Sequence, residues 1–235
     1  MRWGRRHRED KRGRWSDVFA SLACIVIAYM FLRWISFEPF VIPSGSMRPN
    51  LLVQDYVFVK KFAYGLRLPF TKKWLFGPSG IQRGDVVVFK GKGDDFHFLV
   101  KRVIGLPGDS VVVHDDGKLQ VNGEDYSYVG PEASQDEGDM SQFVESHDNL
   151  SYTVQYEKDV YGMDYSIQVP EGEIFLMGDN RNRSMDSRYW GTLPEERVLG
   201  KAWLIWMSCE DSEKLSSMFC PPEAIRWPRL FQWIR

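Results

Sequence analysis

Metal-binding and disulfide motifs are scarce in this sequence. Its 235 residues include three cysteines and four histidines, and none of them forms a CxxC, an HExxH or a cluster of His and Asp residues. Zinc sites depend on such spacings, so we expect no metal ion. Cys209 and Cys220 would close a short loop in an oxidising compartment, but two cysteines leave pairing and free thiols equally open.

A large excess of charge of one sign is also missing. The formal net charge is -2, although basic residues crowd the first 14 positions and acidic residues dominate positions 109–173. Hydrophobic residues make up 43% of the chain, which is enough for a packed core. We therefore expect a folded protein, and we expect no nucleic-acid partner.

The sequence has one long apolar stretch. Residues 18–35 read VFASLACIVIAYMFLRWI, with Arg33 as the only charge, and this length suits a transmembrane helix. The basic cluster before it predicts a cytoplasmic N-terminus and an extracytoplasmic remainder. A cleaved secretory signal is the competing interpretation, but no small-residue cleavage site follows the stretch. A buried core helix is a third alternative.

The chain therefore divides into three expected regions. These are a basic cytoplasmic segment (1–15), a transmembrane helix (16–36) and an extracytoplasmic β-rich domain (37–235). Apolar residues in the domain alternate or form short runs rich in Val, Ile and Phe, which predicts a mostly β, antiparallel fold. We expect the acidic stretch at about 110–173 to be an inserted second β lobe with a mainly solvated surface. The predicted strands are Tyr56 to Lys60, Asp85 to Phe89, Phe96 to Ile104, Ser110 to His114, Leu119 to Val121, Ser151 to Gln155, Ile174 to Met177 and Lys201 to Trp206.

Ser46 is the leading candidate for a nucleophile. It lies in the run PSGSMRP at positions 43–49, shortly after the apolar stretch. Gly45 lets the backbone turn sharply, so the Ser46 N–H and the Ser44 hydroxyl could converge on one oxyanion. Taken alone, the run is more typical of an ordinary Ser/Gly/Pro turn. Its catalytic interpretation therefore requires a base from elsewhere in the chain.

Lys101 is the candidate base. In the predicted strand, its neighbours on the same face are Leu99 and Val103, both apolar. Burial disfavours the ammonium form and lowers a lysine pKa from about 10.4, which yields a neutral amine near neutral pH. A Lys-Arg pair in a strand is otherwise commonly an exposed edge or an ion-pair partner. Ser46 and Lys101 together predict a Ser/Lys hydrolase.

A third run, GDNRNRSMDSRYWG at positions 178–191, is rich in polar side chains that can bind one another. Ser184 or Ser187 could orient the lysine amine, and Asp186 with Arg188 could brace the loop. A purely structural turn remains the alternative, although so many buried polar groups would need partners.

These runs, in this order, resemble the bacterial type I signal peptidase family. The resemblance also includes KFAYG at 61–65, RGDVVVF at 83–89 and GLPGD at 105–109, and it extends over most of residues 36–206. Two positions depart from the family pattern. Asn50 stands where threonine or serine is usual, and Leu99 stands where an aromatic residue is frequent. These departures concern the pocket shape and the hydrogen bonds of the nucleophile loop.

The resemblance implies roles for individual residues. Ser46 would be the nucleophile, Lys101 the general base and Ser184 the residue that positions the lysine. The Ser46 N–H and the Ser44 hydroxyl would form the oxyanion hole. The resemblance also implies supporting residues, namely Asp179, Arg181, Asp186 and Arg188, and residues lining the substrate pockets, namely Phe40, Ile42, Met47, Leu51 and Val100.

The implied function is a membrane-anchored serine endopeptidase that removes signal peptides from secretory preproteins, cutting after small residues and requiring no cofactor. It would cross the bacterial inner membrane once, with the lipid bilayer and the protein export machinery as partners and its catalytic domain in the periplasm. Two alternatives are a non-catalytic, membrane-anchored β-rich binding protein and a self-cleaving Ser/Lys protease of the same clan. A triad built on His97 and an adhesion role for the RGD triplet at 83–85 are weaker alternatives.

Overall fold

The computed structural model describes residues 6–35, 37–67, 74–77, 80–91, 98–130, 140–158, 160, 162, 164–210 and 220–234. The chain forms two compact units, Met1–Phe37 and Glu38–Arg235. His97, the basis of the alternative triad, lies outside the described residues, as do Phe96 at the start of one predicted strand and Ser36 at the end of the predicted span.

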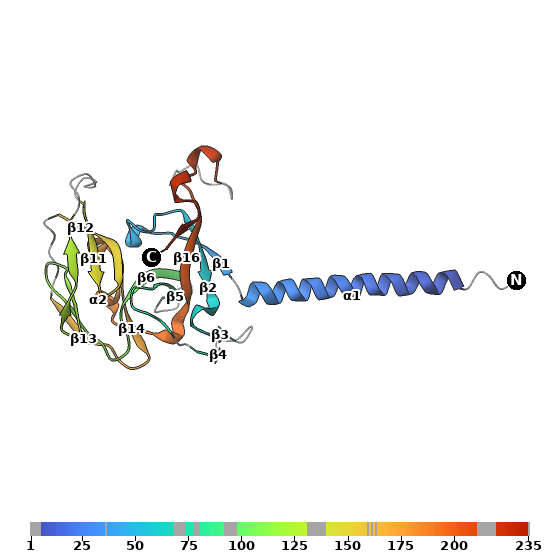
Figure 1. Ribbon diagram of the computed structural model, residues 1–235, viewed down its shortest axis with the longest axis horizontal. Helices are drawn as coiled ribbons and strands as arrows, with labels where there is room; N and C mark the ends of the chain where they lie inside the picture. Colours follow the sequence, from blue (N-terminus) through green and yellow to red (C-terminus); the bar gives the residue numbers. More distant parts are fainter. Residues whose placement is uncertain are drawn as a thin grey trace. The chain divides into compact units, whose positions relative to one another are not determined.

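The first unit consists of helix α1 (Arg6–Ile35), a single continuous helix (Figure 1). Its sequence contains no proline, so nothing interrupts the backbone hydrogen bonds. Large apolar side chains are exposed along it, including Phe19, Leu22, Ile25 and Ile27. Among the helices that the structure describes, none meets the length and hydropathy required to cross a bilayer.

The second unit is mostly β, as predicted, and is built on an eight-stranded sheet. Seven of its strands follow the order β1-β2-β16-β5-β6-β14-β15, and the eighth, β17, pairs with β16. The pairs from β2 to β15 are antiparallel. Strand β6 lies between β5 and β14, so its residues are enclosed on both edges. The strands of this sheet are β1 (Phe37–Val41), β2 (Asp55–Lys60), β5 (Val86–Lys90), β6 (Phe98–Gly105), β14 (Glu173–Met177), β15 (Leu193–Pro194), β16 (Val198–Ser208) and β17 (Gln232–Trp233).

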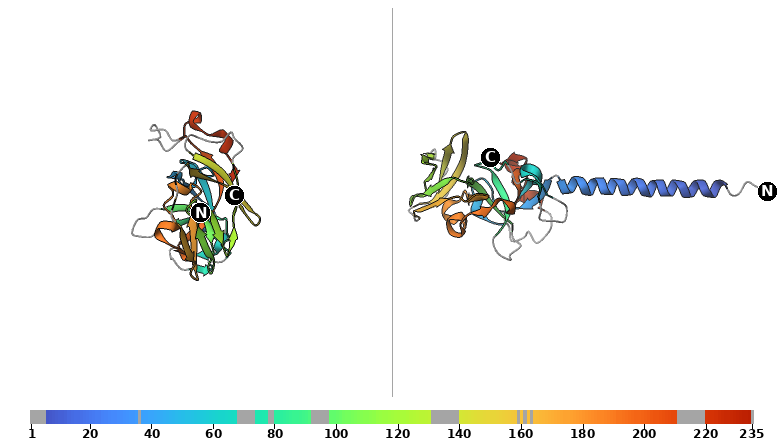
Figure 2. Two further views of the ribbon diagram at one scale, coloured as in Figure 1. Left: turned by 90° about the vertical axis from the view of Figure 1, so that its left-hand side faces the viewer. Right: turned by 90° about the horizontal axis from the view of Figure 1, so that it is seen from below.

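The strands between β6 and β14 form two smaller sheets, with the orders β13-β7-β8-β9 and β10-β11-β12. Figures 1 and 2 show β11 and β12 at one end of the β unit and β2 and β16 at the other. The strands of these sheets are β7 (Ser110–Val113), β8 (Leu119–Val121), β9 (Glu124–Asp125), β10 (Ser127–Val129), β11 (Met140–His147), β12 (Leu150–Glu157) and β13 (Tyr165–Gln168).

Most of the described residues in 110–173 are exposed or partly exposed, as expected, but the segment also contributes to a core that was not expected. Val111, Leu119, Val121 and Val154 are almost fully buried in one apolar cluster that also includes Phe175 of β14. Alternation explains both observations, because acidic side chains raise the charge of a segment while every second residue of a strand can still enter the core.

Every predicted strand overlaps an observed one, but nine of the described strands were not predicted, and among these only β1 and β11 have five or more residues. β11 has the sequence MSQFVESH, which has too few apolar residues to show the period of a strand. The remaining elements are short: β3 (Leu66–Arg67), β4 (Trp74–Phe76), α2 (Ser187–Trp190) and the 3₁₀ turns η1 (Gly45–Met47), η2 (Lys61–Tyr64), η3 (Arg181–Arg183), η4 (Glu195–Arg197), η5 (Pro222–Ala224) and η6 (Trp227–Arg229).

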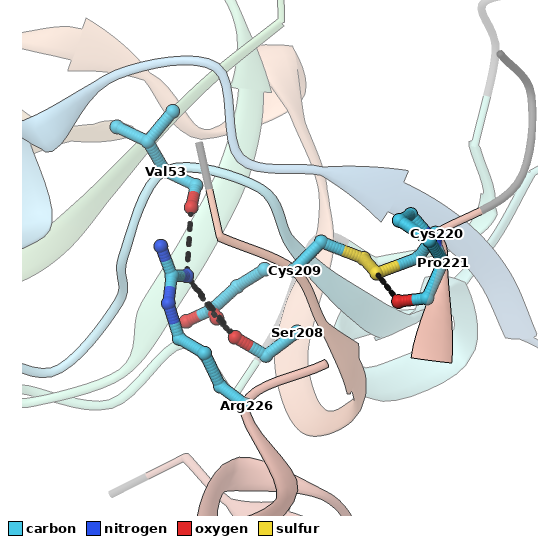
Figure 3. The surroundings of a disulfide bond; sticks show 7 residues. Val53, Ser208, Cys209, Cys220, Pro221 and Arg226 are labelled. Carbon is cyan, nitrogen blue, oxygen red and sulfur yellow. Dashed lines mark hydrogen bonds and ion pairs between the residues drawn. A yellow bond between two sulfur atoms is a disulfide. The ribbon is translucent and has the colours of Figure 1, made fainter. Parts of the chain in front are cut away.

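Cys209 and Cys220 form a disulfide, with their Cα atoms 6.1 Å apart (Figure 3). The bond resolves the two alternatives that the sequence left open. It joins the residue that follows β16 to the segment that leads into η5.

Candidate active site

Residues 42–55 form a closed loop, which we call the nucleophile loop. At its base, Ile42 N donates to Asp55 O at 2.9 Å, and Gln54 N donates to Ile42 O at 3.0 Å. Met47 and Leu51 anchor the loop in an apolar cluster with residues of β2, β5 and β16. Ser46 lies in the η1 turn and is half-buried, which leaves its hydroxyl accessible.

Lys101 of β6 reaches this loop, and its Nζ donates a hydrogen bond to Ser46 Oγ. The lysine side chain is almost fully buried. Burial lowers the pKa of Lys101 to about 8, although Asp186 and Asp179 oppose the shift by favouring the ammonium form. An amine with this pKa is partly neutral near pH 7 and can accept a proton.

Ser44 and Ser46 present neighbouring hydroxyls, with their Oγ atoms 3.4 Å apart. Ser44 is exposed and has an extended backbone, and Gly45 follows it at the start of η1. The two serines predicted to supply the oxyanion hole therefore lie on the same open side of the turn.

The loop that follows β14 holds the nucleophile loop through a residue that the sequence did not single out. Asn180 N donates to Ser46 O at 3.1 Å, and Asn180 Nδ2 donates to Gly45 O at 3.0 Å. A Cβ atom on the nearby Gly178 would collide with both Ser46 O and Ser184 Oγ. Only glycine therefore allows the two loops to approach this closely.

Ser184 is buried beside Gly178, and its Oγ has no hydrogen-bond partner among the described residues. The structure thus does not show the predicted bond between Ser184 and Lys101, because the lysine Nζ is turned toward Ser46. Asp186 and Arg188 form the predicted ion pair at 2.8 Å. The Asp186 carboxylate also accepts a hydrogen bond from Gly178 N at 3.0 Å, which supports the same loop.

Asp179 and Arg181 take part in two separate buried ion pairs. Asp179 binds Arg102 at 2.7 Å, and Arg181 binds Glu145 of β11 at 2.5 Å. All four side chains are at most 1% exposed. Each pair ties the loop after β14 to another strand, so both residues support the site without facing Ser46.

The five predicted substrate-pocket residues differ in accessibility. Ile42, Met47 and Leu51 are at most 1% exposed and belong to the core below the nucleophile loop. Phe40 is half-buried and packs against that core, whereas Val100, at 8% exposed, belongs to the core at its edge nearest solvent.

A metal site is not apparent in the described part of the chain, where no group of three or more His, Cys, Asp or Glu residues could hold an ion. The described residues instead bring together the Ser46 hydroxyl and the buried Lys101 amine, which are joined by a hydrogen bond.

Comparison with known proteins places this arrangement in a family. The sequence model of the signal peptidase family, peptidase S26, matches residues 15–207. Signal peptidase I of Pseudomonas fluorescens is 39% identical over 198 residues, which cover 78% of this chain and 69% of the relative. The chain belongs to the signal peptidase I family.

A second relative, signal peptidase I of Pseudomonas aeruginosa, is 38% identical over 208 residues, covering 83% of this chain and 72% of its own length. A solved signal peptidase I from Enterococcus faecalis is 29% identical to this chain, and the match covers 52% of this chain and 97% of the solved one. Its TM-score of 0.33 is too low for a comparison of the folds. As a member of the signal peptidase I family, the chain is a serine peptidase that removes signal peptides from preproteins. This function replaces the binding-protein and self-cleaving alternatives.

Proposed function

We propose that this signal peptidase cuts its substrates with a catalytic dyad formed by Ser46 and Lys101. The observation that carries the proposal is the hydrogen bond between Lys101 Nζ and Ser46 Oγ in a buried setting. A neutral lysine amine can take the serine proton along that same line, which converts a weak nucleophile into an effective one.

The reaction proceeds in two steps. Lys101 takes the Ser46 proton as Oγ attacks the carbonyl carbon of the scissile bond, and the Ser46 N–H and Ser44 hydroxyl stabilise the oxyanion. The C–N bond then breaks, and the leaving amine takes the proton from Lys101. A water molecule, activated by the neutral lysine, hydrolyses the acyl-enzyme and releases Ser46. The buried hydroxyl of Ser184, which has no hydrogen-bond partner among the described residues, is available to the lysine amine when the amine turns away from Ser46.

Substrate selection is proposed to depend on the surface above the buried core of the nucleophile loop. Phe40 and Val100 would contact the side chains that precede the cut. Ile42, Met47 and Leu51 would form a rigid floor, because they are already enclosed by the core. A floor that cannot deform favours small substrate residues.

The dyad predicts how the rate depends on pH. Below the Lys101 pKa of about 8 the amine is protonated and cannot act as a base, so kcat/KM should rise about tenfold per pH unit and level off above pH 8. The measurement is kcat/KM for a preprotein substrate from pH 6 to 10. A profile that is flat between pH 6 and 9 would contradict a lysine base.

From the sequence, and although no described helix meets the length and hydropathy of a membrane span, we further propose that residues 18–35 anchor the enzyme in the bacterial inner membrane, with a cytoplasmic N-terminus and a periplasmic catalytic domain. Residues 18–35 are apolar apart from Arg33, and a basic segment precedes them, which favours this orientation. The described apolar side chains of α1, such as Phe19 and Ile25, are exposed and would face lipid. The bilayer and the export machinery that delivers preproteins are then the expected partners.

Charged substitutions in α1 should release the protein from the membrane. Asp at Ile25 and Ile27 would each cost about 2.5 to 3.5 kcal/mol at the centre of a spanning helix. The variant with Ile25→Asp and Ile27→Asp should therefore appear in the soluble fraction after an alkaline carbonate wash, whereas the wild type stays in the pellet. Leucine at the same two positions is the matched control and should behave as wild type. Release of the wild type itself would refute the anchor.

A further inference from the structure

The C-terminal residues Cys220–Ile234 lie along β16 and are fixed there at both ends, and we call them the C-terminal strap. The Cys209–Cys220 disulfide attaches its start (Figure 3). Its end is attached by the pairing of β17 with β16 and by a hydrogen bond from Ile234 N to Trp203 O at 3.0 Å. The strap is thus part of the folded domain.

Two arginines of the strap reach the nucleophile loop and donate to its backbone. Arg229 Nη2 donates to Asn50 O at 2.8 Å, and Arg226 Nη1 donates to Val53 O at 3.1 Å. Figure 3 shows Arg226 between Val53 and Ser208. Both arginine side chains are largely buried, with 20% or less of their surface exposed. Because both acceptors are main-chain carbonyls, these two hydrogen bonds restrain the backbone of the nucleophile loop.

The same arginines surround Asp55, a fully buried carboxylate at the end of the nucleophile loop. Arg229 pairs with it at 2.5 Å, and Arg226 lies 4.0 Å away. Ser208 Oγ and Leu52 N also donate to the carboxylate, at 2.5 Å and 2.8 Å. Arg229 therefore joins the Asp55 carboxylate and the Asn50 carbonyl with one planar group.

The nucleophile loop is consequently held at two places. On the side of Ser46, Asn180 binds the carbonyls of Gly45 and Ser46. On the side that leads back to β2, Arg229 binds the carbonyl of Asn50. The Asn50 side chain adds hydrogen bonds to Asp179 and to Thr153 O, at 2.7 Å and 2.6 Å.

We propose that Arg229, carried by the disulfide-linked C-terminal strap, is a positioning residue that keeps Ser46 in line with Lys101 by holding the nucleophile loop at Asn50 and Asp55. The inference rests on the proposed dyad. Without the bond from Arg229 to Asn50 O, the backbone of this side of the loop keeps only its bond from Arg226 to Val53 O, beside the bonds of the Asn50 side chain. The loop is then held less firmly, and Ser46 Oγ can shift from Lys101 Nζ. Displacements of about 1 Å at a reacting atom can lower rates by up to about a hundredfold.

Arg229→Lys tests the proposal with little disturbance of the fold. Lysine keeps the charge beside Asp55 but lacks the planar fork needed to bind Asp55 and Asn50 O together. We expect kcat to fall about tenfold with KM within twofold of wild type, because the substrate surface at Phe40 and Val100 is untouched. The rising limb of the pH profile should stay near pH 8, since the burial of Lys101 does not change.

Arg197→Lys is the matched control. Arg197 also donates to a backbone carbonyl, that of Gly91 at 2.9 Å, but this acceptor lies outside the nucleophile loop. The control should keep wild-type kcat and KM. All assays use the full chain in detergent, well below the thermal midpoint measured for each variant.

Arg226→Lys and Cys220→Ser are the second and third variants. They loosen the strap at Val53 and at the disulfide, and each should lower kcat in the same direction with KM within twofold. The proposal is overturned when Arg229→Lys and Arg226→Lys both fold and retain kcat within twofold of wild type, or when only KM changes. Failure of the dyad itself would be seen separately, as cleavage retained by Ser46→Ala.

Discussion

Replacing Lys101 with methionine, or Ser46 with alanine, is expected to lower kcat by at least about a thousandfold while leaving the protein folded. Methionine fills the buried space of the lysine stem without a titratable group, so the loss reports on the missing base. Because the two residues act as one unit, the double variant should be no slower than either single variant. The measurement is single-turnover cleavage of a preprotein by purified protein in detergent.

The matched control for Lys101→Met is Lys118→Met. Lys118 has an exposed side chain, pairs with Asp116 and lies in the turn between β7 and β8. Its replacement should leave kcat at the wild-type value. Cleavage retained by Lys101→Met would assign the role of base to another residue, and additive losses in the double variant would show that the two residues do not act together.

Replacing Arg181 with methionine is expected to reduce the free energy of unfolding by about 3 to 5 kcal/mol. Arg181 binds both carboxylate oxygens of Glu145, at 2.5 and 2.7 Å, and the two side chains are almost fully buried. Removing the cation leaves Glu145 as an unpaired buried charge, with Tyr152 still donating to it at 2.6 Å. Urea unfolding in detergent, followed by tryptophan fluorescence, provides the measurement.

Two further variants separate the buried charge from the loss of packing. Adding Glu145→Gln to Arg181→Met removes the unpaired charge and should recover a large part of the lost stability. Arg183→Met, which breaks the Arg183–Glu157 pair with 58% of the arginine side chain exposed, should change stability far less. Equal losses for Arg181→Met and Arg183→Met would show that burial of the charge is not the cause.

The sequence predicted the parts of the fold that have a regular apolar period. β2 alternates buried and partly buried residues, and β5 is a continuous apolar run enclosed by β16 and β6. The serine, lysine and polar-loop runs also indicated the site, because their residue types are those that a Ser/Lys mechanism needs. These features are local in the sequence, so a short window is enough to find them.

Other features depend on contacts between distant segments and could not be predicted. The pairing of Arg181 with Glu145 and of Arg102 with Asp179 requires knowledge of which strands lie together. The two roles of Asn180 depend on backbone carbonyls, which leave no mark in the sequence. The one available signal was its position next to Asp179 in a run crowded with polar residues.

The sheet order also determines when activity can first appear during biosynthesis. Strand β2, which follows the nucleophile loop, pairs with β16, and β16 in turn pairs with β5 beside the strand that carries Lys101. β16 begins at Val198, so a growing polypeptide contains both residues of the proposed dyad long before β16 can complete the sheet that holds them. With Ser46 and Lys101 as the proposed dyad, a chain that ends before β16 is therefore expected to lack peptidase activity.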